Sequence, residues 1–97
     1  MFFVVSCIDH PDKEELRLAT RSQHQDYIAA SGGMVKAGGP YLDDKGETMI
    51  GTLIVLDVAD RAAAEAWLRQ DPYSKAGLFE QVEIRLWRWV VGVPAGA

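Results

Sequence analysis

The chain has 97 residues, a formal net charge of −4 and a pI of about 5.0, so it lacks the surplus of basic residues that a nucleic-acid-binding surface or a polybasic membrane patch requires. Hydrophobic residues make up 48% of the chain, but no apolar run reaches the roughly 18 residues of a membrane-spanning helix, and the length fits one globular domain over residues 1–97. The single cysteine, Cys7, rules out an internal disulfide, and the first residues lack the positively charged segment of a signal peptide, so we expect a cytoplasmic protein.

The chain begins with a predicted strand and a long predicted helix. Residues 2–8 are an apolar run rich in aromatic and β-branched side chains, and both faces of this strand are apolar. A helix is predicted over residues 13–30, with Asp12 as its N-cap, Glu15 as the capping-box partner and the glycines of 31–33 at its end. One face of this helix carries an apolar stripe of Leu16, Ala19, Tyr27 and Ala30. Another face, at i, i+3 and i+4 spacing, carries Arg17, Arg21, His24 and Ile28.

The middle of the chain predicts two strands joined by a polar turn. Residues 34–37 start the second strand, which runs into Gly38-Gly39-Pro40. Residues 43–47 are polar and include a glycine, which is typical of a turn between antiparallel strands. The third strand covers residues 49–58 and is again apolar on both faces.

The last third of the chain predicts two helices and a strand. Asp60 is the expected N-cap of an alanine-rich helix, and Pro72 ends that helix because the residue before a proline avoids helical backbone angles. Pro72 also suits the first position of a short further helix, with Asp71 as its cap and Gly77 at its end. The final strand is predicted over residues 80–91.

The resulting order, β-α-β-β-α-β, predicts a ferredoxin-like α+β fold in which two helices cover one face of a four-stranded antiparallel sheet. An uncovered sheet face normally brings polar residues into every second strand position. These strands do not alternate in that way. Because a large exposed apolar face marks an association surface, we expect a homodimer in which the two sheets pack face to face.

His24 and Asp71 are the candidate catalytic residues. Histidine is the side chain best suited to move protons near neutral pH, and a carboxylate on its far nitrogen would fix the tautomer. In this fold the first helix and the end of the second lie on the same side of the sheet, so a meeting is geometrically possible. The alternatives are a surface histidine on a polar helix face and an aspartate that only caps the helix at Pro72.

Three further side chains are candidates for binding a substrate. Arg21 lies one turn before His24 and can hold an anionic group through its guanidinium, or it can be an ordinary solvated helix residue. Tyr73 can line a pocket or pack in the core, and Thr52 can be purely structural. The glycines match no phosphate-binding motif, and Cys7 with the two histidines gives too few ligands for zinc, so we predict neither metal nor cofactor.

Several segments together resemble the YciI-like (YCII-related) family of small bacterial proteins. They are F-F-V-V-S-C-I-D at the start, R-S-Q-H ending at His24, K-A-G-G-P at 36–40, I-G-T-L-I-V at 50–55 and A-W-L-R-Q-D-P-Y-S-K-A-G-L-F-E at 66–80. The last of these segments is the most specific. The resemblance covers nearly the whole chain.

The resemblance implies a ferredoxin-like fold that dimerises as an α+β barrel, with an active site built on a His–Asp pair at the positions of His24 and Asp71. Family-like positions nearby are Arg21, Gly39, Pro40, Thr52 and Tyr73. The family includes a dehydrochlorinase, expected to act on a chlorinated hydroxymuconate, and its fold overlaps with that of muconolactone isomerases. One departure is the turn after the first helix, where relatives often carry an acidic residue and this chain has Ser31-Gly32.

Two functions are therefore expected. The first is a small enzyme that performs cofactor-independent acid–base chemistry, of the elimination (lyase) or isomerase type, on a small anionic or carbonyl metabolite. His24 would be its general base or acid, Asp71 the orienting partner and Arg21 the anchor for a substrate carboxylate. The alternative is a non-catalytic module that binds or senses a small ligand in the same pocket.

Overall fold

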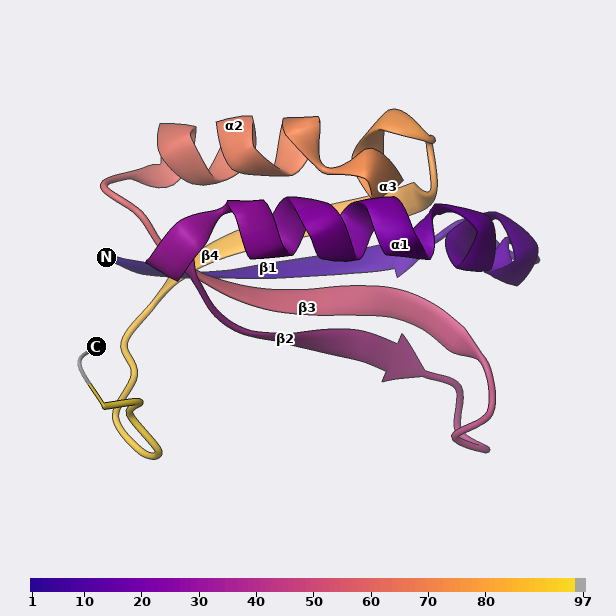
Figure 1. The fold of residues 1–97 in the computed structure, drawn as a ribbon. Helices are drawn as coiled ribbons and strands as arrows, with labels where there is room; N and C mark the ends of the chain where they lie inside the picture. The colour runs from indigo at the N-terminus through magenta and orange to yellow at the C-terminus, as the bar shows by residue number, and fades with distance from the viewer. Residues whose placement is uncertain (96–97) are drawn as a thin grey trace.

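The computed structural model of the chain describes residues 1–95. Its elements are β1 (Phe2–Asp9), α1 (Glu14–Ala30), the 3₁₀ turn η1 (Gly32–Met34), β2 (Val35–Leu42), β3 (Met49–Asp57), α2 (Arg61–Gln70), α3 (Pro72–Lys75) and β4 (Phe79–Trp87). The strands form one sheet in the order β2-β3-β1-β4, and every neighbouring pair is antiparallel. The predicted ferredoxin-like α+β arrangement is confirmed, with the helices on one face of the sheet (Figure 1). In the part of the chain described, no helix combines the length and the hydrophobicity needed to cross a bilayer.

The core lies between the sheet and the helices. Phe3, Val5 and Cys7 of β1 point toward the helices and are buried, because successive side chains of a strand point to opposite faces. They pack with buried side chains of β3 and α2, namely Ile54, Leu56, Ala64, Trp67 and Leu68. Burial, reinforced by the nearby carboxylates of Asp71 and Asp9, raises the pKa of the Cys7 thiol to about 12. Cys7 is therefore a neutral, inert core residue.

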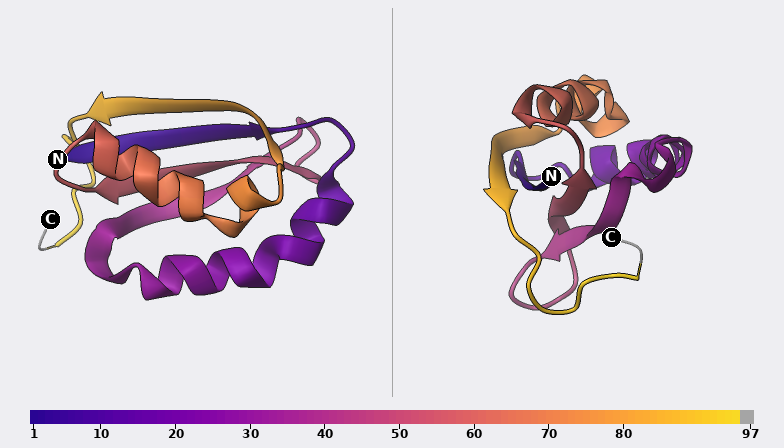
Figure 2. Two further views of the ribbon diagram at one scale, coloured as in Figure 1. Left: turned by 90° about the horizontal axis from the view of Figure 1, so that it is seen from above. Right: turned by 90° about the vertical axis from the view of Figure 1, so that its left-hand side faces the viewer.

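The other face of the sheet carries no helix. The register places Phe2 and Val4 of β1 on this open face together with Leu53 and Val55 of β3. Figure 2 shows both long helices on one side of the sheet and the chain after β4 descending on the other side. Trp89 in that last segment meets Phe2 edge-on, with ring centroids 5.6 Å apart. The open face is thus apolar over β1 and β3, as the strand pattern predicts, whereas β4 adds the exposed charges of Glu83 and Arg85 to it.

Two predicted boundaries are wrong, each for a local reason. Asp12 does not cap α1: its φ is +60°, whereas an N-cap residue needs extended backbone angles, and Lys13 takes that position without a side-chain bond. The last strand ends at Trp87 and not at residue 91. Trp87 pairs with Phe2, the first residue of β1, so β4 has no further strand to bond beyond that point.

The inward face of α1 also differs from the prediction. Its buried residues are Arg17, Thr20 and His24. The predicted apolar stripe is at best half-buried, and two of its members, Ala19 and Ala30, are exposed. The polar face of α1 can be buried because side chains of the strands and of the α2–α3 junction supply hydrogen-bond partners for it, as the site shows.

Candidate active site

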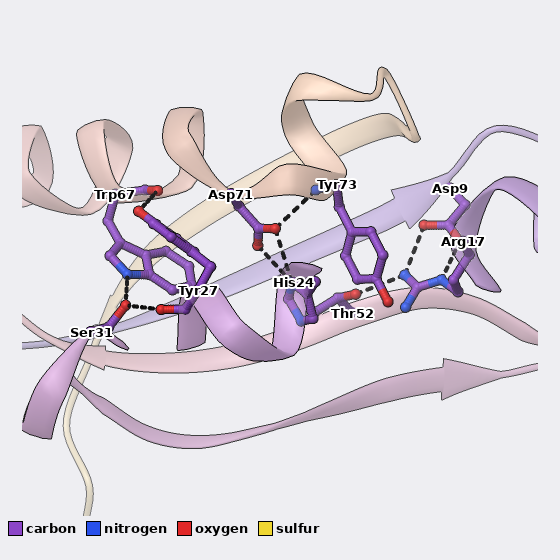
Figure 3. A network of polar contacts seen from close by, with 9 residues as sticks. All are labelled: Asp9, Arg17, His24, Tyr27, Ser31, Thr52, Trp67, Asp71 and Tyr73. Atoms are coloured by element: carbon purple, nitrogen blue, oxygen red, sulfur yellow. Dashed lines mark hydrogen bonds and ion pairs between the residues drawn. The ribbon is translucent and has the colours of Figure 1, made fainter. Parts of the chain in front are cut away.

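A buried histidine–carboxylate contact joins α1 to the junction between α2 and α3. Nδ1 of His24 lies 2.9 Å from Oδ1 and 3.0 Å from Oδ2 of Asp71, although the two residues are 47 positions apart in the chain. Asp71 is fully buried and His24 is 8% exposed. The structure therefore brings the two candidate catalytic residues together, and His24 is not a surface histidine (Figure 3).

Asp71 is held by the helix boundary at which it lies. Its backbone N–H ends α2 by donating to the Leu68 carbonyl, 3.1 Å away. Its Oδ1 then accepts from the backbone N–H of Tyr73 at 3.0 Å and caps α3, with Pro72 at the first helical position. Asp71 therefore does more than cap α3, because the same carboxylate also bonds His24. Such a cap fixes the position of the carboxylate before any substrate arrives.

The contact determines which nitrogen of His24 is free to react. A carboxylate only accepts hydrogen bonds, so the His24 Nδ1 facing Asp71 carries the proton. His24 Nε2 makes no hydrogen bond to the described residues, and among them no buried side-chain nitrogen or oxygen lacks a partner. Nε2 must therefore reach open space. His24 lines a cavity, so a basic nitrogen faces that cavity.

The cavity has a volume of about 250 Å³ and is bounded by α1, β2, β3 and Tyr73. It is lined by all the residues predicted to bind substrate, namely Arg21, Gly39, Pro40, Thr52 and Tyr73, and also by Arg17, Gln25, Ile28, Gly38, Met49 and Ile54. Asp71 is not in this lining and contacts His24 from the junction of α2 and α3 (Figure 3). A space of this size suits a small metabolite.

Tyr73 stacks against the catalytic candidate. Its ring centroid is 4.1 Å from that of His24, with the planes inclined by 20°. Burial raises the pKa of the Tyr73 hydroxyl, while the positive charges of Arg17 and Arg21 oppose that rise. The hydroxyl is therefore a neutral donor at physiological pH, and the ring packs against one face of the His24 imidazole.

A second buried polar group lies at the other end of the cavity. Arg17 forms a two-pronged ion pair with Asp9, with Nε–Oδ2 and Nη2–Oδ1 distances of 2.7 and 3.0 Å. Arg17 Nη2 also donates to the Thr52 hydroxyl at 2.7 Å. The Arg17 guanidinium lies over the Tyr73 ring, 4.6 Å from its centroid. Thr52 thus acts on the cavity mainly by orienting Arg17.

Neither Arg17 nor Asp9 is among the candidates taken from the sequence, although two signals point to them. Arg17 shares the helix face of His24 and lies seven positions before it, which is two turns. Asp9 continues the inward alternation of Phe3, Val5 and Cys7, and a charge at an inward strand position requires a buried partner.

Ser31, in the turn where the resemblance leads us to expect an acidic residue, lies away from the cavity. Ser31 Oγ accepts from Trp67 Nε1 at 2.8 Å and donates to the Tyr27 carbonyl at 2.8 Å. Ser31 does not line the cavity, so it ties α1 to α2. Within residues 1–95, His, Cys, Asp and Glu side chains form no cluster of three or more that could hold a metal ion.

Together the fold and the site define a small ferredoxin-like protein with a buried imidazole–carboxylate pair beside a cavity. The YCII-related domain model matches residues 1–88, and the chain belongs to that family. An uncharacterised protein of Haemophilus influenzae and Protein YciI of Escherichia coli and of Shigella flexneri are each 30% identical over 92 residues. Each of these alignments covers 88% of this chain and 94% of the relative.

Two solved structures extend the comparison. A 5-chloro-2-hydroxyhydroquinone dehydrochlorinase from Burkholderia phenoliruptrix, solved with 2,5-dihydroxybenzoquinone, superposes with a TM-score of 0.82 at 26% identity over 91% of this chain and 94% of its own. The name of this dehydrochlorinase gives a chlorinated hydroxyhydroquinone, and not the expected hydroxymuconate, as the substrate. An antibiotic biosynthesis monooxygenase (TM-score 0.54, 15% identity, 93% of this chain and 99% of its own) shares the fold alone.

Proposed function

We propose that this chain is a small enzyme that transfers a proton to or from a small anionic or carbonyl metabolite without a cofactor, in an elimination or an isomerisation. The observation that carries the proposal is the His24–Asp71 contact, which leaves Nε2 of His24 facing a cavity of about 250 Å³. A histidine oriented by a buried carboxylate is an arrangement that serves general acid–base catalysis.

In the proposed reaction His24 Nε2 accepts a proton from an acidic C–H bond of the substrate. The electron pair of that bond then moves toward the neighbouring carbonyl, or expels a leaving group as an anion in an elimination. Asp71 stabilises the imidazolium that forms, because it already accepts the Nδ1 hydrogen bond. In an isomerisation His24 returns the same proton to another carbon. Arg21, on the cavity wall, would anchor a substrate carboxylate.

The dehydrochlorinase with a similar structure supports the kind of reaction. Dehydrochlorination is an elimination of HCl, which requires a base for the proton and a path for chloride to leave. The similarity, at 26% identity and a TM-score of 0.82, extends to the whole fold. It is a reason to include chlorinated hydroxyhydroquinones among the first compounds to test on this chain.

The test follows proton transfer itself, so it does not depend on knowing the final product. Small carbonyl acids, lactones and 5-chloro-2-hydroxyhydroquinone are incubated with the chain in D₂O, and NMR measures deuterium entry while an electrode measures chloride. We expect His24→Gln to slow exchange by at least about a hundredfold. The matched control is His10→Gln, because His10 is the other histidine of the sequence and is exposed.

The outcome separates the enzyme from a ligand-binding module. Equal exchange rates for the wild type and His24→Gln would sink the proposal. Binding of one of these compounds to the wild type without exchange or chloride release would instead favour the binding module. Circular dichroism of each variant shows whether a lost rate reflects a lost fold.

We also propose that the active form is a homodimer whose open sheet faces pack together. The open face bears a mainly apolar hollow of about 430 Å³ lined by Val4, Leu53, Val55, Arg85, Leu86 and Trp87. A patch of this kind is unusual on a monomer. The Ser6–Tyr41 hydrogen bond, 2.8 Å long, satisfies the polar groups of both side chains on the same face.

Light scattering tests the dimer. We expect the wild type to have about twice the chain mass of 10.7 kDa, and Leu53→Glu to be monomeric because a carboxylate would be buried at the interface. Leu18→Glu is the matched control, since Leu18 is exposed on α1 at the helix side of the sheet. A monomeric wild type, or a dimer that survives Leu53→Glu, would contradict this assembly.

A further inference from the structure

The Arg17 guanidinium is a charged part of the cavity wall that the proton transfer described above does not use. Its side chain is only 3% exposed. Nε and Nη2 bond the carboxylate of Asp9, and Nη2 also bonds the hydroxyl of Thr52 (Figure 3). Because these bonds come from two different strands, the guanidinium is held in one orientation whether or not a ligand is present.

One edge of this guanidinium, at Nη1, is used by neither Asp9 nor Thr52, and the Tyr73 hydroxyl, whose pKa the charge and hydrogen bonding of Arg17 lower, is a further polar neighbour of the guanidinium. Arg17 Nη1 makes no hydrogen bond to any residue of the described range 1–95. Within that range no buried side-chain nitrogen or oxygen is without a partner, so Nη1 must reach open space. Arg17 lines the cavity, and Nη1 can therefore donate a charged hydrogen bond to whatever occupies it.

Arg17 and His24 occupy opposite ends of one wall. The Tyr73 ring lies between them (Figure 3), with its centroid 4.1 Å from the His24 ring centroid and 4.6 Å from Cζ of Arg17. The two residues are two turns apart on α1, a rise of about 10 Å. A small ring or a short conjugated chain can thus touch the basic nitrogen at one end and the cationic donor at the other.

We propose that Arg17 binds the substrate oxygen that becomes negative when His24 removes a proton. The substrate class is then a small conjugated carbonyl compound, or the keto tautomer of a phenol, in which the acidic carbon is linked through double bonds to that oxygen. The electron pair of the broken C–H bond moves along the conjugated system to the oxygen, and the proton stays on His24 Nε2. Fixed donors placed where negative charge develops are among the strongest contributions to catalysis. This inference deepens the proposed function and rests on it for the role of His24.

The oxyanion can be imitated without any reaction. Binding of 4-nitrophenol places a phenolate in the cavity, and its absorbance reports directly how much of the bound probe is ionised. We expect the wild type to bind the ionised form preferentially, which lowers the pKa of the bound probe. The variant Arg17→Lys keeps the positive charge but loses the planar guanidinium, with its two-pronged bond to Asp9 and its Nη1 donors. Its affinity for the phenolate should fall by about tenfold or more.

Two further variants complete the experiment. Thr52→Val removes only the hydroxyl that orients Nη2, so its affinity should lie between those of the wild type and Arg17→Lys. Arg69→Gln removes an exposed charge of α2 and should bind the phenolate as the wild type does. If Arg17→Lys fails to fold, as judged by circular dichroism, the comparison between Thr52→Val and the wild type decides the question.

Failure of this inference is distinguishable from failure of the proposed function. No binding of the phenolate to the wild type, or equal binding by the wild type and every folded variant at positions 17 and 52, would overturn the role of Arg17. Neither result requires proton abstraction. Conversely, an unchanged exchange rate in His24→Gln would overturn the function while leaving phenolate binding by Arg17 intact.

Discussion

Replacing Asp71 by Asn is expected to lower the rate of proton transfer by about 10³–10⁴-fold while the fold is kept. Both carboxylate oxygens lie within 3.0 Å of His24 Nδ1. An amide nitrogen in place of one oxygen would meet the Nδ1–H group as a second donor. The imidazole then favours the other tautomer, with its proton on Nε2, and the atom facing the cavity is no longer a base. The cap of α3 survives, because the amide oxygen still accepts from Tyr73.

Two measurements check this expectation. The deuterium-exchange assay gives the rate, and nitrogen NMR of the His24 ring shows which nitrogen carries the proton in each protein. Asp60→Asn is the matched control, since Asp60 also caps a helix through its side chain but is exposed, and its side chain bonds Ala63 and not His24. An Asp71→Asn protein with the wild-type tautomer and a rate within a few-fold of wild type would refute the orienting role.

The sequence predicts which residues of a strand share a face, but not which face is inward. Alternation groups Phe3, Val5 and Cys7 of β1, and these three are buried, although both faces of the strand are apolar. Prediction from the sequence fails where the end of a helix or strand depends on a residue that is distant in the chain. The length of β4 is set by the start of β1, with which it pairs, and no residue near Trp87 carries that information. Asp12 likewise has the composition of a cap, but its left-handed backbone angle reflects the turn that joins β1 to α1.

The candidate site, like the fold, could be predicted only in part from the sequence. The residue types of His24 and Asp71 suit acid–base chemistry, and the fold makes their meeting possible. The contact itself depends on the packing of α1 against α3, which is a tertiary property. Arg17 is harder to recognise, because an amphipathic helix is expected to bury its apolar side. Here the buried side is polar, since Asp9 and Thr52 on the sheet lie opposite Arg17.

The largest change in stability is expected at the Asp9–Arg17 ion pair. The side chains of Asp9 and Arg17 are 4% and 3% exposed, so Asp9→Ala leaves a guanidinium buried without its carboxylate. Removing one partner of a buried pair typically costs about 3–5 kcal/mol of the free energy of unfolding. Urea denaturation followed by circular dichroism measures this loss. The exposed His10–Glu80 pair is the matched control, and Glu80→Ala should leave the unfolding midpoint essentially unchanged.

A double variant tests whether the Asp9–Arg17 ion pair serves the stability of the fold or the binding of a ligand in the cavity. Taking two charges out of water costs free energy that their attraction only partly returns, so an apolar pair of similar volume is often equally stable. We therefore expect Asp9→Leu combined with Arg17→Met to recover most of the stability that Asp9→Ala loses, and at the same time to lose phenolate binding. Full stability without binding would mean that the ion pair serves the cavity and not the fold. A double variant as unstable as Asp9→Ala would instead mean that the pair stabilises the fold. A double variant that still binds the phenolate would show that Arg17 is not the group that binds it.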